Sequence, residues 1–140
     1  MTMISVTPAL PVLDLGVAAA FYRDRLGFTV VHLDDGIAVL RRDEAWIHLW
    51  CSNNEDWREI DPVELAQRPV RMGAESFLSG TASCRIQVDN VDELFQEMTA
   101  QSVVHPVSKS GPTDTEWDTQ EFAALDLDGN LLAFFQLREQ

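Results

Sequence analysis

The sequence Trp46-Ile47-His48-Leu49-Trp50 predicts a β-strand with two very different faces. Successive side chains of a strand point to opposite faces, so the two tryptophans and the histidine share one face and the aliphatic pair shares the other. The aliphatic face is typical of packing against a helix. The aromatic face carries ring nitrogens that need hydrogen-bond partners when buried. Two interpretations therefore remain open: the wall of a concave binding site, or an ordinary core strand with satisfied nitrogens.

The residues before this strand predict a helix and further strands around it. Asp14 is an N-cap candidate, and Gly27 stands where a helix commonly ends in a left-handed turn. Between them, apolar residues recur at helical spacing. Strands are expected over 28–33, 37–40 and 45–51, and a proline-bearing edge strand lies within 3–12. The order is strand, helix, strand, strand, strand.

The same order returns in the second half of the chain. A strand over 81–88 precedes a helix whose start, Asn90 to Glu93, has the spacing of a capping box. Strands follow over 103–107, 122–127 and 130–137, with a loop over 108–118. This repeat predicts two βαβββ modules, residues 1–52 and 81–140, joined by a 53–80 linker within one structural domain. We expect an α+β fold in which a curved mixed sheet surrounds a cleft and the helices cover its convex side.

Charge and composition restrict the function. The chain holds 10 Lys and Arg against 23 Asp and Glu, a formal net charge of −13, which disfavours nucleic-acid and membrane-surface partners and attracts cations. No apolar run approaches the roughly 20 residues that cross a bilayer. Cys51 and Cys84 form no C-x-x-C pair, which argues against a disulfide scaffold and a cysteine zinc site. We expect a cytoplasmic protein.

Several motifs resemble the vicinal oxygen chelate superfamily, which includes glyoxalase I, extradiol dioxygenases and bleomycin resistance proteins. In the first module these are Asp14-Leu15, then Ala20-Phe21-Tyr22 and Leu26-Gly27-Phe28. In the second, the run 126–132, Asp-Leu-Asp-Gly-Asn-Leu-Leu, is similar to the closing hairpin of that superfamily. The resemblance spans nearly the whole chain outside the linker, and it implies the two-module fold more specifically than any one chemistry.

The resemblance also implies where a metal would be bound. Metalloenzyme members place a ligand on the first and last strands of each module, and the matching positions here are Thr7, His48, Ser83 and Ala133. A catalytic divalent metal needs about three protein ligands. We therefore expect no metal site, no cofactor and no metal-dependent catalysis.

Members that lack metal ligands include the bleomycin resistance proteins, and Pro8 and Pro11 in the first strand and Trp117 before the strand over 122–127 are similar to theirs. The resemblance implies a non-catalytic homodimer that sequesters a bleomycin-like cationic glycopeptide by stacking its flat rings on aromatic side chains, conferring resistance. Strand parity and the acidic loops add further candidates. The predicted ligand-binding residues are Trp46, His48, Trp50, Trp57, Arg85, Glu116, Trp117 and Phe135.

Two alternatives remain open on the sequence. One is an enzyme of the same superfamily, a lyase, isomerase or dioxygenase with an unusual site around His48. The other is a binder of a different planar small molecule. The carboxylates Glu116, Asp118 and Glu121 are interpreted as a solvated acidic cluster rather than as acid–base groups. Trp57 is either a lid over the cleft or an anchor for the linker.

Overall fold

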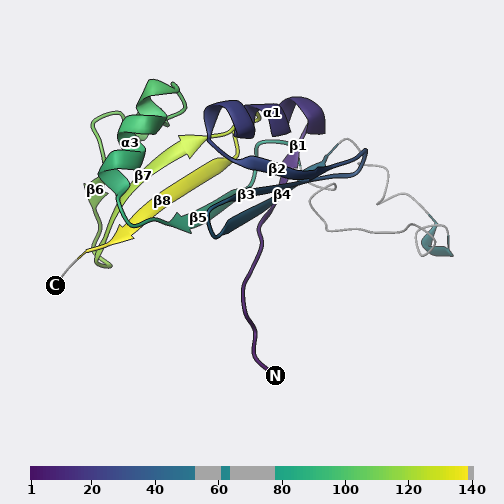
Figure 1. Cartoon of the computed structure of the whole chain (residues 1–140), viewed down its shortest axis with the longest axis horizontal. Coiled ribbons are helices and arrows are strands. Elements are labelled where there is room, and N and C mark those ends of the chain that lie inside the picture. Colours follow the sequence, from purple (N-terminus) through teal and green to yellow (C-terminus); the bar gives the residue numbers. More distant parts are fainter. Residues whose placement is uncertain (53–60, 64–77, 139–140) are drawn as a thin grey trace.

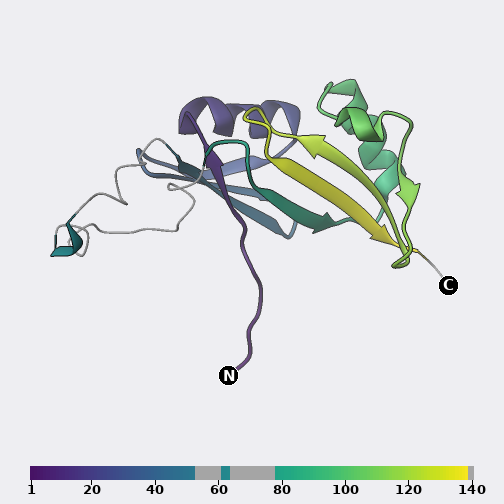
Figure 2. The same cartoon turned by 180° about the vertical axis from the view of Figure 1, so that it is seen from behind.

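The computed structural model describes residues 1–52, 61–63 and 78–138 of the chain. These residues form two four-stranded mixed sheets, with the helices α1 (Leu15–Arg25) and α3 (Val91–Ala100) on the same side of them (Figure 1). Seen from behind, α1 and α3 again lie on the same side of the sheets (Figure 2). The α+β class and the placement of both helices on one side are confirmed.

The first sheet has the order β1-β4-β3-β2. Its strands are β1 (Ala9–Val12), β2 (Thr29–Leu33), β3 (Ile37–Arg42) and β4 (Ala45–Cys51). β1 runs parallel to β4, and the other neighbours are antiparallel. The edge position of β1 suits Pro11, because proline has no N–H to donate to a second neighbour. The bounds predicted for β4 are those observed.

The second sheet repeats this arrangement in the order β5-β8-β7-β6. Its strands are β5 (Ser83–Gln87), β6 (Thr113–Asp114), β7 (Thr119–Leu125) and β8 (Leu131–Leu137). The strand predicted over 103–107 is wrong: only Val104 forms a bridge, to Ala124, and the turn η3 (Pro106–Ser108) follows at once. Pro106 lacks the N–H that would extend the pairing. The short strand β6 lies instead within the predicted loop.

Local sequence explains the helix ends. The Asp14 side chain accepts a hydrogen bond from the backbone N–H of Val17 at 3.0 Å, and the Asn90 side chain caps α3 by accepting from Glu93 N–H at 3.1 Å. After α1 the chain turns at Gly27, whose φ of 76° is the left-handed conformation that favours glycine. Both predicted caps are confirmed.

The core lies between the sheets and the helices. The side chains on this face alternate along the strands with those on the open face. The buried strand residues include Leu10, Val12, Ile47, Leu49, Leu132 and Phe134. Two more, Ile86 and Val88, are half-buried and pack against the same cluster. The aliphatic half of the Trp-Ile-His-Leu-Trp strand therefore faces the helices, as predicted.

A buried polar cluster joins the two modules. The Asn130 side chain donates to the backbone oxygen of Pro11 and to the Asp126 carboxylate, both at 2.9 Å, and accepts from Ala82 N–H at 3.1 Å. Tyr22 of α1 donates its hydroxyl to Asp126 at 2.8 Å. Burial and the adjacent Asp126 carboxylate raise the pKa of Tyr22 well above its usual value, so this hydroxyl stays protonated. The cluster ties β1 and α1 to the hairpin between β7 and β8.

A second connection lies on the helical side. The Arg42 guanidinium, at the end of β3, donates two hydrogen bonds to the Glu97 carboxylate of α3, at 2.6 and 2.8 Å, and one to Leu26 O at 2.8 Å. Arg25 also donates to the backbone oxygen of Gln101. The two modules are thus joined by two separate sets of hydrogen bonds. No helix among the described residues is long and apolar enough to cross a membrane.

Candidate functional site

The aromatic face of β4 lies on the side of the first sheet away from α1. Register pairs Trp46 with Arg41, His48 with Val39, and Trp50 with Ile37, so these side chains share that face. The three β4 residues differ greatly in exposure. The Trp46 ring is 39% exposed and lies 5.2 Å from the guanidinium carbon of Arg41, within cation–π range. The exposed Trp46 ring is therefore already in contact with the positive charge of Arg41.

Two ring nitrogens on the same face of β4 as Trp46 have no hydrogen-bond partner among the described residues. Trp50 is only 8% exposed, and its indole Nε1 has no hydrogen-bond partner in the described part of the chain. The Nδ1 atom of His48, which is half-buried, also lacks one. Leaving such an atom buried and unpaired costs about 1–3 kcal/mol. Two neighbouring unpaired groups on one face are the kind of feature that a bound ligand satisfies.

A compact network occupies the equivalent face of the second sheet. Glu121 on β7 stands opposite Phe135 on β8 in register. Its carboxylate accepts two hydrogen bonds from Arg85 of β5, each at 2.7 Å, and one from the indole N–H of Trp117 at 2.9 Å. The hydroxyl of Thr119 donates to it as well. The Arg85 guanidinium lies 4.5 Å above the Phe135 ring. We call these five residues the Glu121 network.

The Glu121 carboxylate is ionised throughout the physiological range. Hydrogen bonds from Arg85 chiefly, then from Thr119 and Trp117, lower its pKa to about 2, against the opposing effect of burial. Its side chain is 14% exposed. The positive charge of Arg85 therefore meets a permanent negative charge, and the two cancel at this part of the face.

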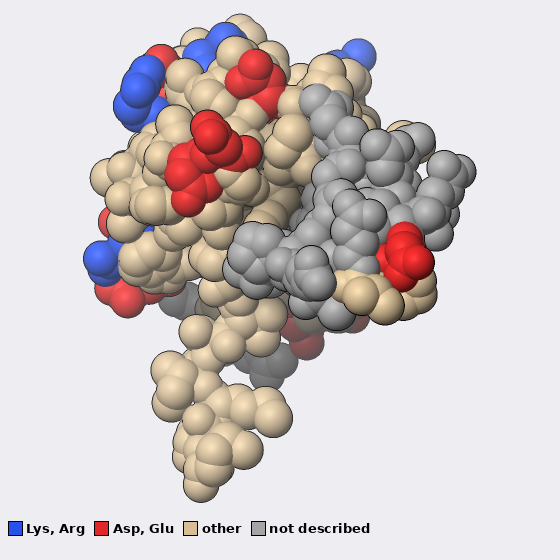
Figure 3. Space-filling model, turned by 90° about the vertical axis from the view of Figure 1, so that its right-hand side faces the viewer, with Lys and Arg blue, Asp and Glu red and all other residues tan. Residues whose placement is uncertain are grey.

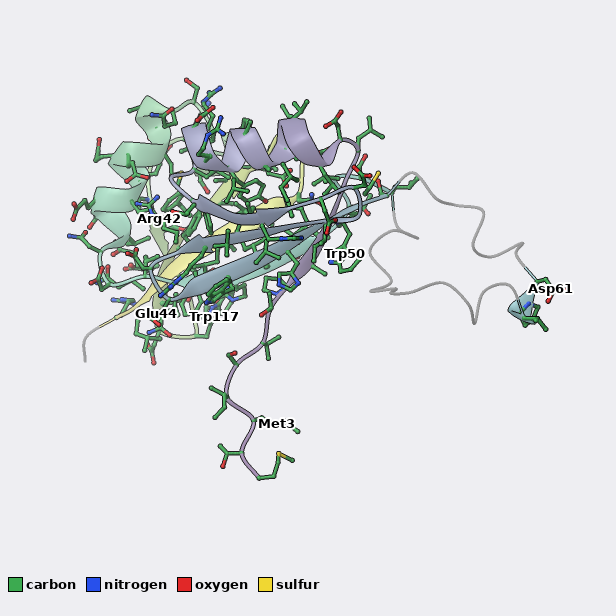
Figure 4. The ribbon with its side chains drawn as sticks, turned by 45° about the vertical axis from the view of Figure 1, so that its right-hand side comes forward. Met3, Arg42, Glu44, Trp50, Asp61 and Trp117 are labelled. Carbon is green, nitrogen blue, oxygen red and sulfur yellow. The ribbon has the colours of Figure 1, made fainter. Side chains whose placement is uncertain are left out.

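Trp117 is the most exposed of the described candidate rings. The residue is 64% exposed although its N–H is held by Glu121. Figure 4 places it on the side of the sheets opposite α1, the side from which the N-terminal segment with Met3 also projects. A large ring that is both fixed and open to solvent is available to stack on a planar guest.

The predicted site residues fall into two groups on different sheets. Register and hydrogen bonds bring Arg85, Trp117 and Phe135 together on the second sheet, whereas Trp46, His48 and Trp50 line the first. Glu116, directly before Trp117, is exposed. Trp57 lies outside the described residues. Within the part of the chain that the structure describes, no hydrogen bond joins the two groups.

Sequence reasoning missed Glu121. We expected it to belong to a solvated acidic cluster, and that interpretation is wrong for this residue, because its carboxylate is mostly buried under Arg85 and Trp117. Side chains alternate along β7, so Glu121 and the buried Phe122 lie on opposite faces, and this much follows from the sequence alone. The pairing of Glu121 with a cation two strands away does not, because that needs the β5-β8-β7 order.

Two of the four expected metal-ligand positions, His48 and Ala133, are paired with residues that offer no further ligand. Pairing sets Ala9 beside His48 and Arg85 beside Ala133. A methyl group and a guanidinium cannot coordinate a cation. Within residues 1–52, 61–63 and 78–138, no group of three or more His, Cys, Asp or Glu side chains is arranged to hold a metal ion.

A separate hollow of about 440 Å³ lies at the N-terminal end of α1. It is lined by the start of α1, the turn between β2 and β3, and the end of β4: Leu13, Asp14, Leu15, Gly16, Leu33, Asp34, Asp35 and Cys51. The carboxylate of Asp34 is already engaged by His32 and by its own turn, which lower its pKa to about 2. The candidate residues within the described ranges do not line this hollow.

Comparison with known proteins gives a consistent family. The model of the Glyoxalase/Bleomycin resistance protein/Dioxygenase superfamily matches residues 5–134. Bleomycin resistance proteins of Geobacillus stearothermophilus and of Staphylococcus aureus strain MRSA252 are each 46% identical over 134 residues, covering 96% of this chain and 97% of theirs.

Solved structures agree on the fold. A bleomycin resistance determinant encoded on the transposon Tn5 is 25% identical with a TM-score of 0.69, covering 99% of this chain and 100% of that one. A bleomycin-binding protein complexed with bleomycin is 24% identical with a TM-score of 0.67, covering 96% and 98%. A lactoylglutathione lyase from Agrobacterium tumefaciens is 20% identical with a TM-score of 0.68, covering 94% and 92%. The fold alone therefore serves both binders and an enzyme.

Proposed function

Because the chain belongs to the Glyoxalase/Bleomycin resistance protein/Dioxygenase superfamily, we propose that it sequesters a bleomycin-like cationic glycopeptide and thereby confers resistance. The relatives at 46% identity are named bleomycin resistance proteins, and this likeness extends over nearly the whole chain. The lactoylglutathione lyase shares the fold at lower identity. The sequence likeness thus favours the binder over the enzyme.

The observation that carries the proposal is the fixed, exposed indole of Trp117 beside the Arg85–Phe135 stack. Stacking of a flat ring on an aromatic side chain contributes on the order of 1–3 kcal/mol in comparable nucleobase systems. Holding the ring in place beforehand removes part of the entropy cost of binding. The proposed ligand-binding residues remain Trp46, His48, Trp50, Trp57, Arg85, Glu116, Trp117 and Phe135.

The charge of the chain supports a cationic ligand. A formal net charge of −13 attracts a positively charged molecule and raises its rate of encounter. Glu116 places one such charge directly beside Trp117 in the chain. The proposal is a binder that leaves the drug unchanged, and the residues at the metal-ligand positions, Thr7, Ser83 and Ala133 with His48, support that distinction from the metalloenzymes of the family.

We further propose that the functional unit is a homodimer. Residues 1–8 precede β1 and stand out from the body, and Met1, Met3, Ile4 and Val6 are almost fully exposed (Figure 3). Exposed apolar side chains of this kind are typical of a segment that a second copy covers. Sedimentation of the purified protein tests this: a single species of twice the chain mass supports the dimer, and a monomer at tens of micromolar contradicts it.

We also propose that the protein is cytoplasmic. Cys51 and Cys84 are free thiols, and burial raises the pKa of the Cys84 thiol to about 11. Unpaired cysteines persist in a reducing compartment.

Fluorescence titration with metal-free bleomycin tests the proposed function. We expect saturable quenching of tryptophan emission, and Trp117→Ala is expected to weaken binding about tenfold or more, on the magnitude for one stacked ring. Val107→Ala, which shortens an exposed side chain of η3, serves as the control and should bind like the wild type.

No quenching by the wild type at tens of micromolar drug would contradict bleomycin as the ligand. A thermal-shift screen of other planar cations then separates a binder of a different molecule from a protein that binds none, because a ligand of the folded state raises its apparent stability. Turnover of a glutathione-derived substrate would favour the enzyme instead.

A further inference from the structure

We infer that Glu121 is a positioning residue, which holds Trp117 and Arg85 so that this part of the face receives a planar, uncharged portion of the ligand. This inference rests on the proposed function. It assigns a role to Glu121 and separates two contacts of the ligand. The flat rings stack on the second sheet, and the positive charge binds at another part of the protein.

The first step concerns what the carboxylate does. Its two oxygens accept from Arg85, from the Trp117 indole and from the Thr119 hydroxyl, which come from β5, the segment before β7, and β7 itself. A carboxylate with this many donors has little capacity left for a ligand. Glu121 therefore acts through its neighbours rather than by direct contact.

The second step concerns the orientation that results. The Trp117 side chain has one hydrogen-bonding atom, and Glu121 accepts from it, so the contact fixes the direction of the ring edge while most of the residue stays exposed. The bidentate pair likewise fixes the plane of the Arg85 guanidinium, whose carbon lies 4.5 Å from the Phe135 ring centre. A purely structural ion pair would stabilise the sheet without presenting an open indole.

The third step concerns charge. Arg85 alone would repel a cationic ligand, but its partner is ionised and adjacent, so the pair presents almost no net charge. A flat neutral ring system gains from stacking at such a surface, whereas a cation gains little. We therefore expect the cationic end of the ligand to bind near carboxylates that are not paired with an Arg or Lys side chain.

Two substitutions at the same position separate positioning from charge. Glu121→Asp keeps the negative charge but withdraws the carboxylate by one methylene, and Glu121→Gln keeps the length but removes the charge. If Glu121 positions its neighbours, both variants bind metal-free bleomycin about three- to tenfold more weakly, the range expected for losing the preorganisation of one or two side chains. Wild-type affinity in Glu121→Asp would overturn the inference, because charge alone would then suffice.

A double-mutant cycle gives the second test. In a Trp117→Ala background, Glu121→Asp should weaken binding by a smaller factor than it does in the wild type, since only the orientation of Arg85 is then left to lose. An undiminished effect in that background would mean that Glu121 does not act through Trp117, and it would overturn the inference. Asp92→Asn on the exposed face of α3 is the control for a change of one charge unit, and it should bind like the wild type.

A measurement without ligand keeps this inference distinct from the proposed function. Emission of Trp117 is obtained as the difference between each protein and its Trp117→Phe counterpart. We expect acrylamide to quench this emission more strongly in Glu121→Asp than in the wild type, with both proteins folded by circular dichroism. Equal quenching would overturn the positioning role, whether or not bleomycin binds. If Glu121→Asp does not fold, the same comparison is made with Glu121→Gln, where equal quenching would again overturn the positioning role.

Discussion

Glu121 shows how one side chain can decide the character of a surface. Its neighbours Arg85 and Trp117 differ in charge and shape, yet both are oriented by the same carboxylate. The consequence is a face that combines an exposed ring with nearly cancelled charge. Removal of the Glu121 carboxylate would leave an unpaired cation and an indole without its hydrogen-bond acceptor at the site.

At the scale of this residue, acid should destabilise the network in a defined range. The pKa of Glu121 falls from its ordinary 4.5 to about 2 in the folded state, chiefly through Arg85. A lowered pKa contributes stability that is present above the ordinary value and is lost as the pH falls toward the folded value. The difference in unfolding free energy between wild type and Glu121→Gln should therefore be constant from pH 8 to about 5 and shrink between about 4.5 and 2.

Urea denaturation of both proteins across this pH range measures the difference. The other acidic groups with lowered pKa values, such as Asp34 and Glu97, are common to both proteins and cancel. Parallel loss of stability in the two proteins between pH 4.5 and 2 would contradict the assigned pKa of Glu121.

At the scale of the element, β4 combines the two interpretations of its sequence. Ile47 and Leu49 are fully buried under α1, while on the opposite face Trp46 is exposed and Trp50 is nearly buried. The buried, unpartnered nitrogens of His48 and Trp50 match neither a satisfied core strand nor a fully open wall. One face of β4 thus packs in the core, while the other face has polar atoms without hydrogen-bond partners among the described residues.

The entry into β5 gives the element-scale prediction. Gly80 has a φ of 78°, and a Cβ at this position would lie 2.0 Å from the backbone oxygen of Asp128. Gly80→Ala should therefore lower the free energy of unfolding by at least about 2 kcal/mol, from backbone strain plus a clash that only backbone movement relieves.

Gly16→Ala is the matched control for this change. It lies in the first turn of α1, where a Cβ would meet only the Asp14 side chain at 3.6 Å. Alanine favours the helix, so this variant should be as stable as the wild type or up to about 1 kcal/mol more stable. Equal stabilities of the two variants in denaturant would contradict the close approach of Gly80 to the β7–β8 hairpin.

At the scale of the whole molecule, we propose that the modules form one structural domain. The Asn130 cluster and the Arg42–Glu97 pair join them through contacts far apart in sequence. Buried, fully satisfied polar networks fix the relative position of the parts that they connect. We therefore expect a single cooperative unfolding transition at a fixed protein concentration.

Asn130→Ala tests this connection. The substitution leaves Ala82 N–H and part of the Asp126 carboxylate without their buried partner, and it should cost about 3 kcal/mol. Asn90→Ala, the same change at the exposed cap of α3, should cost about 1 kcal/mol. Two separate transitions in the wild type, or equal costs for the two asparagines, would contradict a single domain joined by this cluster.

Part of the candidate site could be predicted and part could not. Trp117 and Phe135 were identified from the resemblance and from strand parity, because parity depends only on neighbouring residues. The cation–π pair between Arg41 and Trp46 and the role of Glu121 depend on which strands are neighbours. The error over residues 103–107 had a local cause, since Pro106 interrupts the pairing that the valines favour.

Local sequence patterns predicted the repeated βαβββ order, the helix caps, the buried face of β4 and the acidic character of the chain. These follow from local rules, namely side-chain alternation, capping and charge, which act over a few residues. The contacts of Glu121 with Arg85 and Trp117, and those by which Asn130 joins the modules, became known only from the folded chain. Those contacts join residues up to 119 positions apart, and their partners are selected by strand order and register rather than by any nearby residue.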